Sequence, residues 1–359
     1  MNKILFGLGI ALLLLGTSCK DDDTPQAEPA RPHADVYPED LVDIEDYLHK
    51  AYVEVTRNAG GDVIDVKIDT LDADHTVSIW DQTDYPLMSK IVKLYGVDFK
   101  VYYLKFDDKG DTDADGDKPC GVDRILTTYR GTTIVRTAVV DPDTDLTSYV
   151  FENKEFDYAP NPVEFNLIDV IKGWEHVMPL FRAGFFDPND IDGTLNSINY
   201  GSGAMFLPSG LGYYNGAGVN GSIPAYTPLI FTFNLHAVTR LDQDFDKIES
   251  RYEYELDEDG NLIDTDADGI PDIFDADDDN DGYLTKNEIT HTVTVLENGV
   301  ETVYRYVYPF NGAAVDDPVT IYVDEAQGIP DCSLDYATPT RVRRHLDKNC
   351  FAIINEDLP

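Results

Sequence analysis

Basic residues are scarce in this sequence. Its 359 residues include 27 Lys and Arg against 68 Asp and Glu, a formal net charge of −41 at pH 7. Nucleic acids and anionic membrane surfaces attract proteins through clustered positive charge. This balance therefore excludes nucleic acid as a partner. Much of the acidity lies in short runs rich in aspartate, a pattern that indicates bound divalent cations rather than an evenly solvated surface.

Cysteine is scarce as well. The chain has four cysteines, and no two of them have Cys-x-x-Cys spacing, so nothing indicates a zinc or redox site. Cys332 and Cys350 lie close in the chain and flank a polar segment. We expect these two to form a disulfide, which leaves Cys120 as a lone thiol that is buried rather than reactive.

Long apolar runs are missing except at the N-terminus. The stretch "MNKILFGLGIALLLLGTSC" is too short for a comfortable membrane span and has the pattern of an export signal. Residues 1–18 resemble a lipoprotein signal peptide, with Cys19 as the lipid-bearing first residue of the mature chain. Gly16 stands where such signals usually carry leucine, and a plain secreted protein is the alternative.

The residues after Cys19 form a predicted flexible tether over 19–40, rich in Pro, Ala and Asp. Its first residues, "KDDD" (20–23), resemble the acidic export tag of some Bacteroidetes lipoproteins. The resemblance implies an outer-membrane lipoprotein attached to the membrane through its N-terminal lipid. It favours the cell surface over the periplasmic face.

The remaining chain predicts an α+β protein. Leu41, Ile44, Leu48 and Tyr52 have helical spacing, and "YPLMSKIVKLYG" (85–96) predicts a second short helix, so 41–98 form a helical N-terminal extension. Alternating strands then fill 99–245 and predict a mostly antiparallel sheet with one short helix near Trp174. Residues 293–359 form a C-terminal region with a β-hairpin turning at Asn298-Gly299.

Six blocks of residues occur in a characteristic order between about Phe99 and Val238. They are Tyr129-Arg130-Gly131, Phe156-Asp157, "VEFNL" (163–167), "VIKGW" (170–174), "LPSGLGYY" (207–214) and "IPAYTPLIFTF" (223–233). This series resembles the FKBP-type peptidyl-prolyl isomerases. The resemblance implies an antiparallel sheet wrapped on a short helix over 99–245. It also implies isomerase activity on proline-containing client proteins, with no cofactor for catalysis.

The same resemblance implies one apolar pocket for a proline ring. Trp174 is its floor, Ile223 lies at its rim, and the backbone N–H of Ile171 donates to a substrate carbonyl. Asp157 and Tyr213 are the polar members; Tyr214 is the alternative to Tyr213, which the spacing from Pro208 favours. The walls are Tyr129, Phe156, Val163, Val170, Ile171 and Phe231. Val163 stands where many members of the family have phenylalanine. The alternative is that these aromatic residues are ordinary core.

A second candidate site lies in the acidic segment 246–292. Asp277, Asp279, Asp281 and Glu288 fit the EF-hand calcium loop, with the backbone carbonyl of Tyr283 as a further ligand. A similar spacing occurs just upstream, in Asp264, Asp266, Asp268, Asp272 and Asp275. In tandem the two runs resemble thrombospondin type 3 repeats, which implies structural calcium. An acidic disordered linker is the alternative.

Two functions follow from these patterns. The first is a lipid-anchored peptidyl-prolyl cis-trans isomerase of the cell envelope, acting as a folding catalyst or chaperone. The second is a non-catalytic accessory or binding subunit of an outer-membrane protein assembly. The complete set of pocket residues favours catalysis, whereas the long extensions favour binding to partners.

Overall fold

The computed structural model describes residues 29–107, 117–186, 197–216, 218, 221–257, 260–297, 299–311, 328–335, 338, 340–350 and 354–357. The chain divides into two units, residues 1–31 and 32–359, and every helix and strand described below belongs to the second. The predicted signal peptide (1–18), Cys19 and the tag at 20–23 lie outside the described residues. Within the described ranges, no helix is both long and apolar enough to cross a membrane.

The described residues contain three α-helices and thirteen strands. The helices are α1 (His33–Lys50), α2 (Lys172–Val177) and α3 (Thr285–Glu288). The strands are β1 (Ala51–Arg57), β2 (Val63–Thr70), β3 (Met88–Leu94), β4 (Val97–Asp107), β5 (Arg124–Val140), β6 (Thr147–Asn166), β7 (Phe185–Phe186), β8 (Ser197–Ile198), β9 (Gly201–Leu207), β10 (Leu229–Thr239), β11 (Thr290–Glu297), β12 (Val300–Val307) and β13 (Ile354–Asp357).

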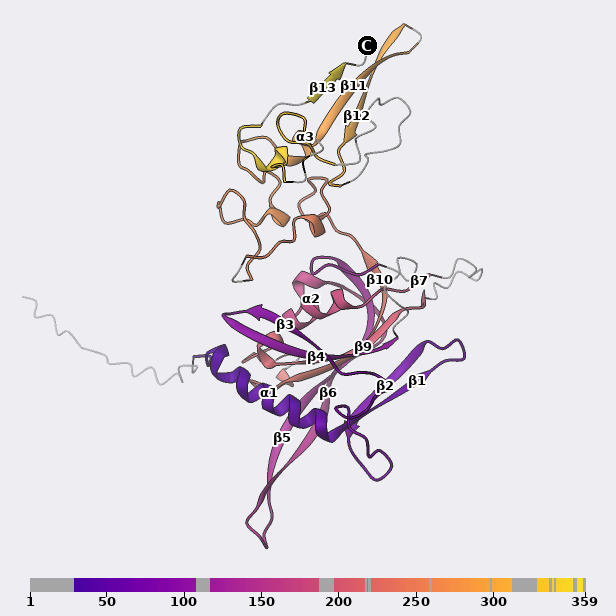
Figure 1. Cartoon of the computed structure of the whole chain (residues 1–359), viewed down its shortest axis with the longest axis vertical. Coiled ribbons are helices and arrows are strands. Elements are labelled where there is room, and N and C mark those ends of the chain that lie inside the picture. The colour runs from indigo at the N-terminus through magenta and orange to yellow at the C-terminus, as the bar shows by residue number, and fades with distance from the viewer. Residues whose placement is uncertain are drawn as a thin grey trace, which may run out of the picture. The chain divides into compact units, whose positions relative to one another are not determined.

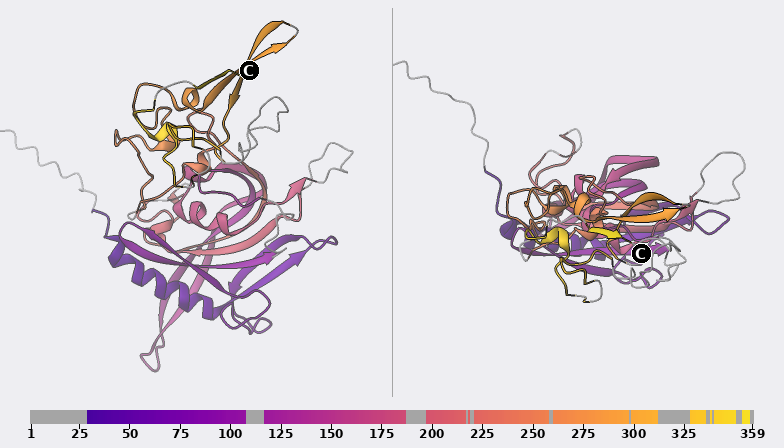
Figure 2. Two further views of the ribbon diagram at one scale, coloured as in Figure 1. Left: turned by 45° about the horizontal axis from the view of Figure 1, so that its top comes forward. Right: turned by 90° about the horizontal axis from the view of Figure 1, so that it is seen from above.

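A six-stranded sheet is the centre of the fold. Its strand order is β3-β4-β9-β10-β5-β6, and every neighbouring pair is antiparallel (Figure 1). β5 and β6 form a long hairpin whose far end continues past the other strands of the sheet (Figure 2). The mixed α+β class with a mostly antiparallel sheet is therefore confirmed.

The sheet is covered on both faces, because successive side chains of a strand point to opposite sides. In β9, Met205 and Leu207 belong to the core cluster that contains Trp174 of α2. Ala204 and Phe206, the residues between and before them, belong to a second cluster with Ile44, Tyr47 and Leu48 of α1. All seven residues of β9 are buried, as expected for a strand packed on both faces.

The N-terminal extension differs from its prediction at both ends of the helix. α1 begins at His33 rather than near Leu41, so the predicted tether over 19–40 is too long by the helical residues 33–40. The helix ends at Lys50, and Ala51 is already extended, with φ −117° and ψ 152°. Tyr52 therefore lies in β1, which pairs with β2 as an antiparallel hairpin.

The predicted second helix in 85–96 is wrong. Residues Met88–Leu94 form β3, an edge strand paired with β4. Near its end, buried Val92 and Leu94 alternate with exposed Ile91 and Lys93, which is strand and not helix periodicity. Since β3 belongs to the central sheet, this sheet begins before Phe99, the predicted start of the isomerase-like region.

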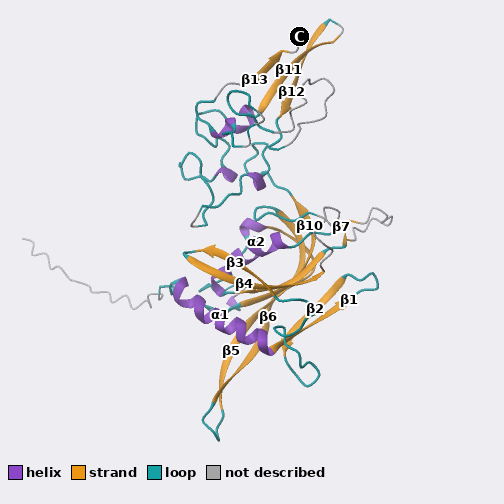
Figure 3. Cartoon of the chain, in the orientation of Figure 1, coloured by secondary structure: helices purple, strands orange, loops and turns teal. Residues whose placement is uncertain are grey.

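Residues between β10 and β11 have little regular structure (Figure 3). The strands that follow, β11 and β12, form the antiparallel hairpin expected at Asn298-Gly299, and Gly299 has φ +81°. β13 adds a third, parallel strand to β11. The hydrophobic core cluster of this part is small, with four buried members: Ile248, Ile289, Tyr308 and Ile329.

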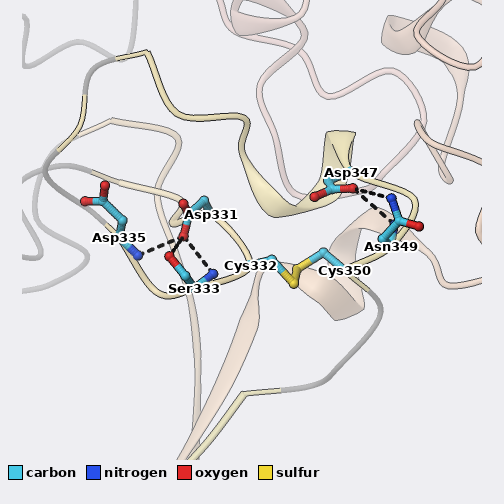
Figure 4. The surroundings of a disulfide bond; sticks show 7 residues. All are labelled: Asp331, Cys332, Ser333, Asp335, Asp347, Asn349 and Cys350. Atoms are coloured by element: carbon cyan, nitrogen blue, oxygen red, sulfur yellow. Dashed lines mark hydrogen bonds between the residues drawn. A yellow bond between two sulfur atoms is a disulfide. The ribbon is translucent and has the colours of Figure 1, made fainter.

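The structure joins Cys332 and Cys350 by a disulfide, with Cα atoms 5.3 Å apart (Figure 4). One oxygen of Asp331 accepts hydrogen bonds from the backbone N–H groups of Ser333 and Asp335, at 2.8 and 2.9 Å, and so fixes the turn beside Cys332. Cys120 is free and partly buried. Burial raises the pKa of its thiol, which keeps the reactive thiolate rare.

Candidate functional site

An apolar pocket lies between α2 and the strands β5, β6 and β10. Its volume is about 270 Å³. That is close to the lower end of the usual range for small-molecule sites and suits one small ring with its flanking groups. Nine residues line it: Tyr129, Asp157, Phe165, Asp169, Val170, Ile171, Trp174, Tyr213 and Phe231.

Trp174 is the centre of the aromatic wall. It is 3% exposed, and its ring lies 5.4 Å from Phe231, 5.5 Å from Tyr129 and 5.8 Å from Phe165, each in an edge-to-face arrangement. Edge-to-face pairs fix ring orientation as well as burying apolar area. The pocket is therefore preformed by rings that hold one another in place.

Two glycines permit this packing. A Cβ on Gly173 would lie 2.2 Å from the Cδ1 atom of Leu207, so only glycine lets α2 lie this close to β9. A Cβ on Gly131 would lie 2.6 Å from Phe156 Cζ and 2.9 Å from Phe231 Cε1. Glycine at 131 therefore leaves room for the aromatic rings beside the pocket.

The polar side of the pocket is a hydrogen-bonded pair. The hydroxyl of Tyr129 donates to Asp157 Oδ2 at 2.5 Å, and Asp157 Oδ1 accepts from the backbone N–H of Tyr158 at 2.9 Å. Burial first, and then the bond to Asp157, raise the pKa of Tyr129. Burial and the charge of Asp157 also raise the pKa of Tyr213, so both phenols are neutral hydrogen-bond donors at physiological pH.

The structure brings seven of the ten predicted pocket residues together around this space. Three are placed elsewhere. Phe156 does not line the pocket and lies edge-on to Tyr213 and Phe231, which do. Ile223 is 4% exposed and packs in the core rather than at the rim. Val163 lies in β6 opposite Thr127, outside the pocket lining.

Phe165 supplies the wall that the sequence assigned to Val163. The two residues lie two apart in β6 and share one face of the strand. The pairing of β5 with β6 shifts register between Thr127 and Tyr129, which re-aims the side chains along this edge. The signal that could have identified Phe165 is this shared strand face.

Two acidic loops in the segment after β10 have the same backbone geometry. In residues 264–275, Asp264 Oδ2 accepts from Gly269 N at 2.9 Å, and in residues 277–288, Asp277 Oδ2 accepts from Gly282 N at 3.2 Å. Both glycines have positive φ, +102° and +92°. These bonds curl each loop so that its alternate aspartates face inward.

Each loop gathers three carboxylates that could hold one cation. Asp264, Asp266 and Asp268 each offer an oxygen, and these atoms lie within 4.8 Å of one another; Asp277, Asp279 and Asp281 do the same. The second loop also contains Glu288, which is 2% exposed and has no hydrogen bond to either oxygen. Burial and the charges of Asp279 and Asp281 raise the pKa of Glu288 to about 8. Unpaired buried carboxylates of this kind fit a hard cation.

The remaining predicted ligands behave differently. Asp272 lies outside the first group, because its two oxygens accept from the N–H and the hydroxyl of Thr265, each at 2.7 Å. Asp275 also lies outside the group, and its Oδ1 accepts from Asp277 N. Tyr283 donates its backbone N–H to Asp281 Oδ1 at 2.7 Å, so it lies beside the predicted ligands of the second loop.

Comparison with known proteins gives one family match. Residues 243–322 match the family model described as BamM C-terminal. This range includes both acidic loops and the β11–β12 hairpin. A search of curated proteins found no match.

Solved structures similar to this chain include three peptidyl-prolyl isomerase or FKBP proteins. A peptidyl-prolyl cis-trans isomerase from Pseudomonas syringae pv. tomato matches with a TM-score of 0.31 and 16% identity, over 59% of this chain and 100% of that one. FkpA from Escherichia coli matches with a TM-score of 0.26 and 24% identity, over 39% of this chain and 48% of that one. The N-terminal domain of FKBP42 from Arabidopsis thaliana matches with a TM-score of 0.27 and 12% identity, over 42% of this chain and 92% of that one.

Proposed function

We propose that the pocket around Trp174 binds the proline ring of a client polypeptide and catalyses cis-trans isomerisation of the bond before it. The observation that carries this proposal is the pocket itself. Seven residues assigned to it by the FKBP resemblance converge on one space, and they come from β5, β6, α2, β10 and the segments beside them. An ordinary core would leave no such opening, since protein interiors are close-packed.

The chemistry suits a pocket with few polar groups. Amide resonance sets a rotation barrier of about 18–20 kcal/mol. The twisted amide has lost that resonance and is less charge-separated than the planar one, so a dry aromatic surface favours the twisted form. Each tenfold increase in rate requires the activation free energy to fall by about 1.36 kcal/mol. An acceleration of four to five orders of magnitude therefore requires the pocket to stabilise the twisted amide over the planar one by roughly 5–7 kcal/mol. No nucleophile takes part.

The remaining polar groups orient the substrate. Asp157 is held by Tyr129, so its carboxylate has a fixed direction at the pocket wall. Within the described residues, no hydrogen bond is made by the Tyr213 hydroxyl, which lines the same space. We assign Tyr213 and the backbone N–H of Ile171 as donors to substrate carbonyl oxygens.

A protease-coupled isomerisation assay on X–Pro peptides tests this function. We expect the wild-type chain to act well above the uncatalysed rate and Asp157→Asn to lose about tenfold in kcat/KM. Glu164→Gln is the matched control, because Glu164 lies in the same strand, is largely exposed and does not line the pocket. A wild-type rate equal to background, with no binding of FK506-like macrolides, would reject catalysis.

The second candidate function is that of an accessory subunit of an outer-membrane protein assembly. The match of residues 243–322 to the BamM C-terminal family supports it. On this proposal Cys19 carries the lipid that holds the chain at the outer membrane. Cys19→Ser should then move the protein from the membrane to the soluble fraction. Protease treatment of intact cells separates the surface location, which we favour, from the periplasmic one.

We also propose that the loops 264–275 and 277–288 each bind a structural calcium ion. The unpaired inward-facing oxygens of Asp264, Asp266, Asp277, Asp279 and Asp281 support this assignment. The small apolar core of the C-terminal part gives calcium a stabilising role there. Chelation should expose this segment to protease, and added calcium should protect it again. Equal cleavage rates with and without calcium would leave only an acidic linker.

A further inference from the structure

A third acidic loop directly follows β10. The stretch "DQDFDKIESRYE" (242–253) has carboxylates at its first, third, fifth and twelfth positions: Asp242, Asp244, Asp246 and Glu253. This is the spacing of the loop 277–288, except that Lys247 occupies the sixth position, where the other two loops have glycine. The missing glycine hides this loop from a search for the calcium motif.

The backbone nevertheless adopts the same curl. Lys247 has φ +87°, beside +102° at Gly269 and +92° at Gly282. Lys247 N donates to Asp242 Oδ2 at 3.3 Å, the counterpart of the bonds made by the two glycines. Ile248 N donates to Asp246 Oδ1 at 2.7 Å, as Tyr283 N does to Asp281 Oδ1. A non-glycine residue is strained at this φ, so the surrounding contacts impose the shape.

The side chains inside this loop are buried and unpaired. Asp244, Asp246, Glu253 and Asp278 each offer an oxygen, and these four atoms lie within 4.8 Å of one another. Asp246 is 0% and Asp278 is 1% exposed. Asp246 Oδ2 and both oxygens of Asp278 and Glu253 have no hydrogen-bond partner. Asp278 belongs to the loop 277–288, so this cluster connects two loops.

Nothing in the described residues balances this negative charge. No lysine or arginine there forms a salt bridge with any of the four carboxylates. Buried charges without partners are strongly unfavourable. The cluster therefore needs protons or a cation.

The ligand set favours calcium. Ca²⁺ takes six to eight oxygen ligands in flexible geometry, whereas Mg²⁺ requires a near-ideal octahedron and usually keeps several waters. The four carboxylate oxygens lie within 4.8 Å of one another, so one such ion can contact them all. Asp242 adds a fifth carboxylate, since its Oδ1 is buried and has no partner.

We propose that Asp242, Asp244, Asp246, Glu253 and Asp278 form a third calcium site, beyond the two in the loops 264–275 and 277–288. Because Asp278 reaches it from the loop 277–288, one ion holds the start and the end of the acidic segment together. A hydrogen bond also connects this site to α2, the helix that carries Trp174. Tyr254, which follows Glu253, donates its hydroxyl to Glu175 Oε1 of α2 at 2.7 Å.

Calcium titration of the metal-stripped full chain tests this proposal, with bound ions counted by native mass spectrometry and affinities measured by calorimetry. We expect three ions on the wild type. Glu253→Gln and Asp278→Asn should each bind two tightly, with at least tenfold weaker binding of the third. Glu255→Gln is the matched control: it makes the same chemical change two residues further on, at an exposed side chain, and should still bind three.

The outcomes separate this proposal from that for the other two loops. Two ions on the wild type, with one lost in Glu288→Gln and none in Glu253→Gln, would overturn only the third site. No calcium uptake at millimolar concentration would overturn all three sites. Glu253 and Asp278 lie in different loops, so where one of these variants does not fold the other still tests the third site.

Discussion

Phe165 and Val163 differ by two positions in one strand, and only Phe165 reaches the pocket. Phe165 packs against Tyr129 and Trp174, with ring centroids 5.6 and 5.8 Å apart. Phe165→Ala should therefore remove one wall and lower kcat/KM for X–Pro peptides by about tenfold, since aromatic pairs contribute about 0.5–1.5 kcal/mol each. Val163→Ala should leave the rate within about twofold. Equal losses in both variants would contradict the pocket described here.

Asp40 predicts a specific pH dependence of stability. It is 3% exposed, and its Oδ2 accepts from Ser209 N at 2.8 Å and Ser209 Oγ at 2.7 Å, close to the segment that carries Tyr213. Burial raises its pKa from 3.8 to about 7. Between these values the unfolded chain has released the proton and the native chain still holds it. The free energy of unfolding therefore falls as pH rises from about 4 to about 7, by at most about 4 kcal/mol.

Asp40→Asn removes this titration while keeping a side-chain oxygen as acceptor for Ser209. We expect urea unfolding to show the variant gaining stability relative to wild type as pH rises from about 4 to about 7, and no further change above that range. All other titrating groups are the same in the two proteins, so the difference between their free energies of unfolding reports the titration of Asp40 alone. A difference that is constant across this range would show that Asp40 does not retain its proton in the native state.

At the scale of elements, local patterns predicted strands better than helix ends. Strands β4, β5, β9 and β10 contribute residues to both cores, and their runs of apolar and β-branched residues are visible in the sequence. In β3, Ile91 is 50% exposed although apolar, and this blurs the alternation enough to suggest a helix. Only the pairing with β4 determines that these residues form a strand and not a helix, and this pairing is a tertiary contact.

The residues of the candidate sites also fall into two groups, those that local sequence predicts and those that it does not. Trp174, Tyr129, Asp157 and Phe231 could be predicted because they lie within short, recognisable blocks of sequence. The strand face that Phe165 shares with Val163 makes it a candidate, but which of the two lines the pocket depends on how β6 packs in the sheet, and that is a tertiary contact. The third acidic loop was missed for a different reason, because the fold holds Lys247 in a conformation that sequence rules reserve for glycine.

Tyr254 connects the acidic segment to the pocket helix. Its hydroxyl donates to Glu175, a carboxylate that is 3% exposed and that also accepts from Lys172 Nζ at 2.5 Å. A hydrogen bond to a buried charged group contributes about 1.5–3 kcal/mol, so Tyr254→Phe should lower the free energy of unfolding by about that amount. Tyr149→Phe, which removes a hydroxyl from a 41% exposed ring, is the control and should have little effect. Equal stability of the two variants in urea would show that the contact is not formed.

At the scale of the whole molecule, the chain combines an aromatic pocket with an acidic segment that lacks a large core of its own. The pocket is preformed by packed rings. The acidic segment gathers buried, unpaired carboxylates, which repel one another without one. Calcium should therefore control the stability of the segment far more than the intrinsic chemistry of the pocket.

The proposed activity of the pocket around Trp174 is catalysed rotation about X–Pro bonds. Two-dimensional NMR exchange spectroscopy on an X–Pro peptide with a catalytic amount of the chain measures this directly, without a coupling protease. The uncatalysed bond exchanges in tens to hundreds of seconds, too slowly to give exchange cross-peaks. We predict cross-peaks between the cis and trans forms in the presence of wild-type chain, and their loss when an FK506-like macrolide is added. Spectra that are identical with and without the chain would contradict the claim.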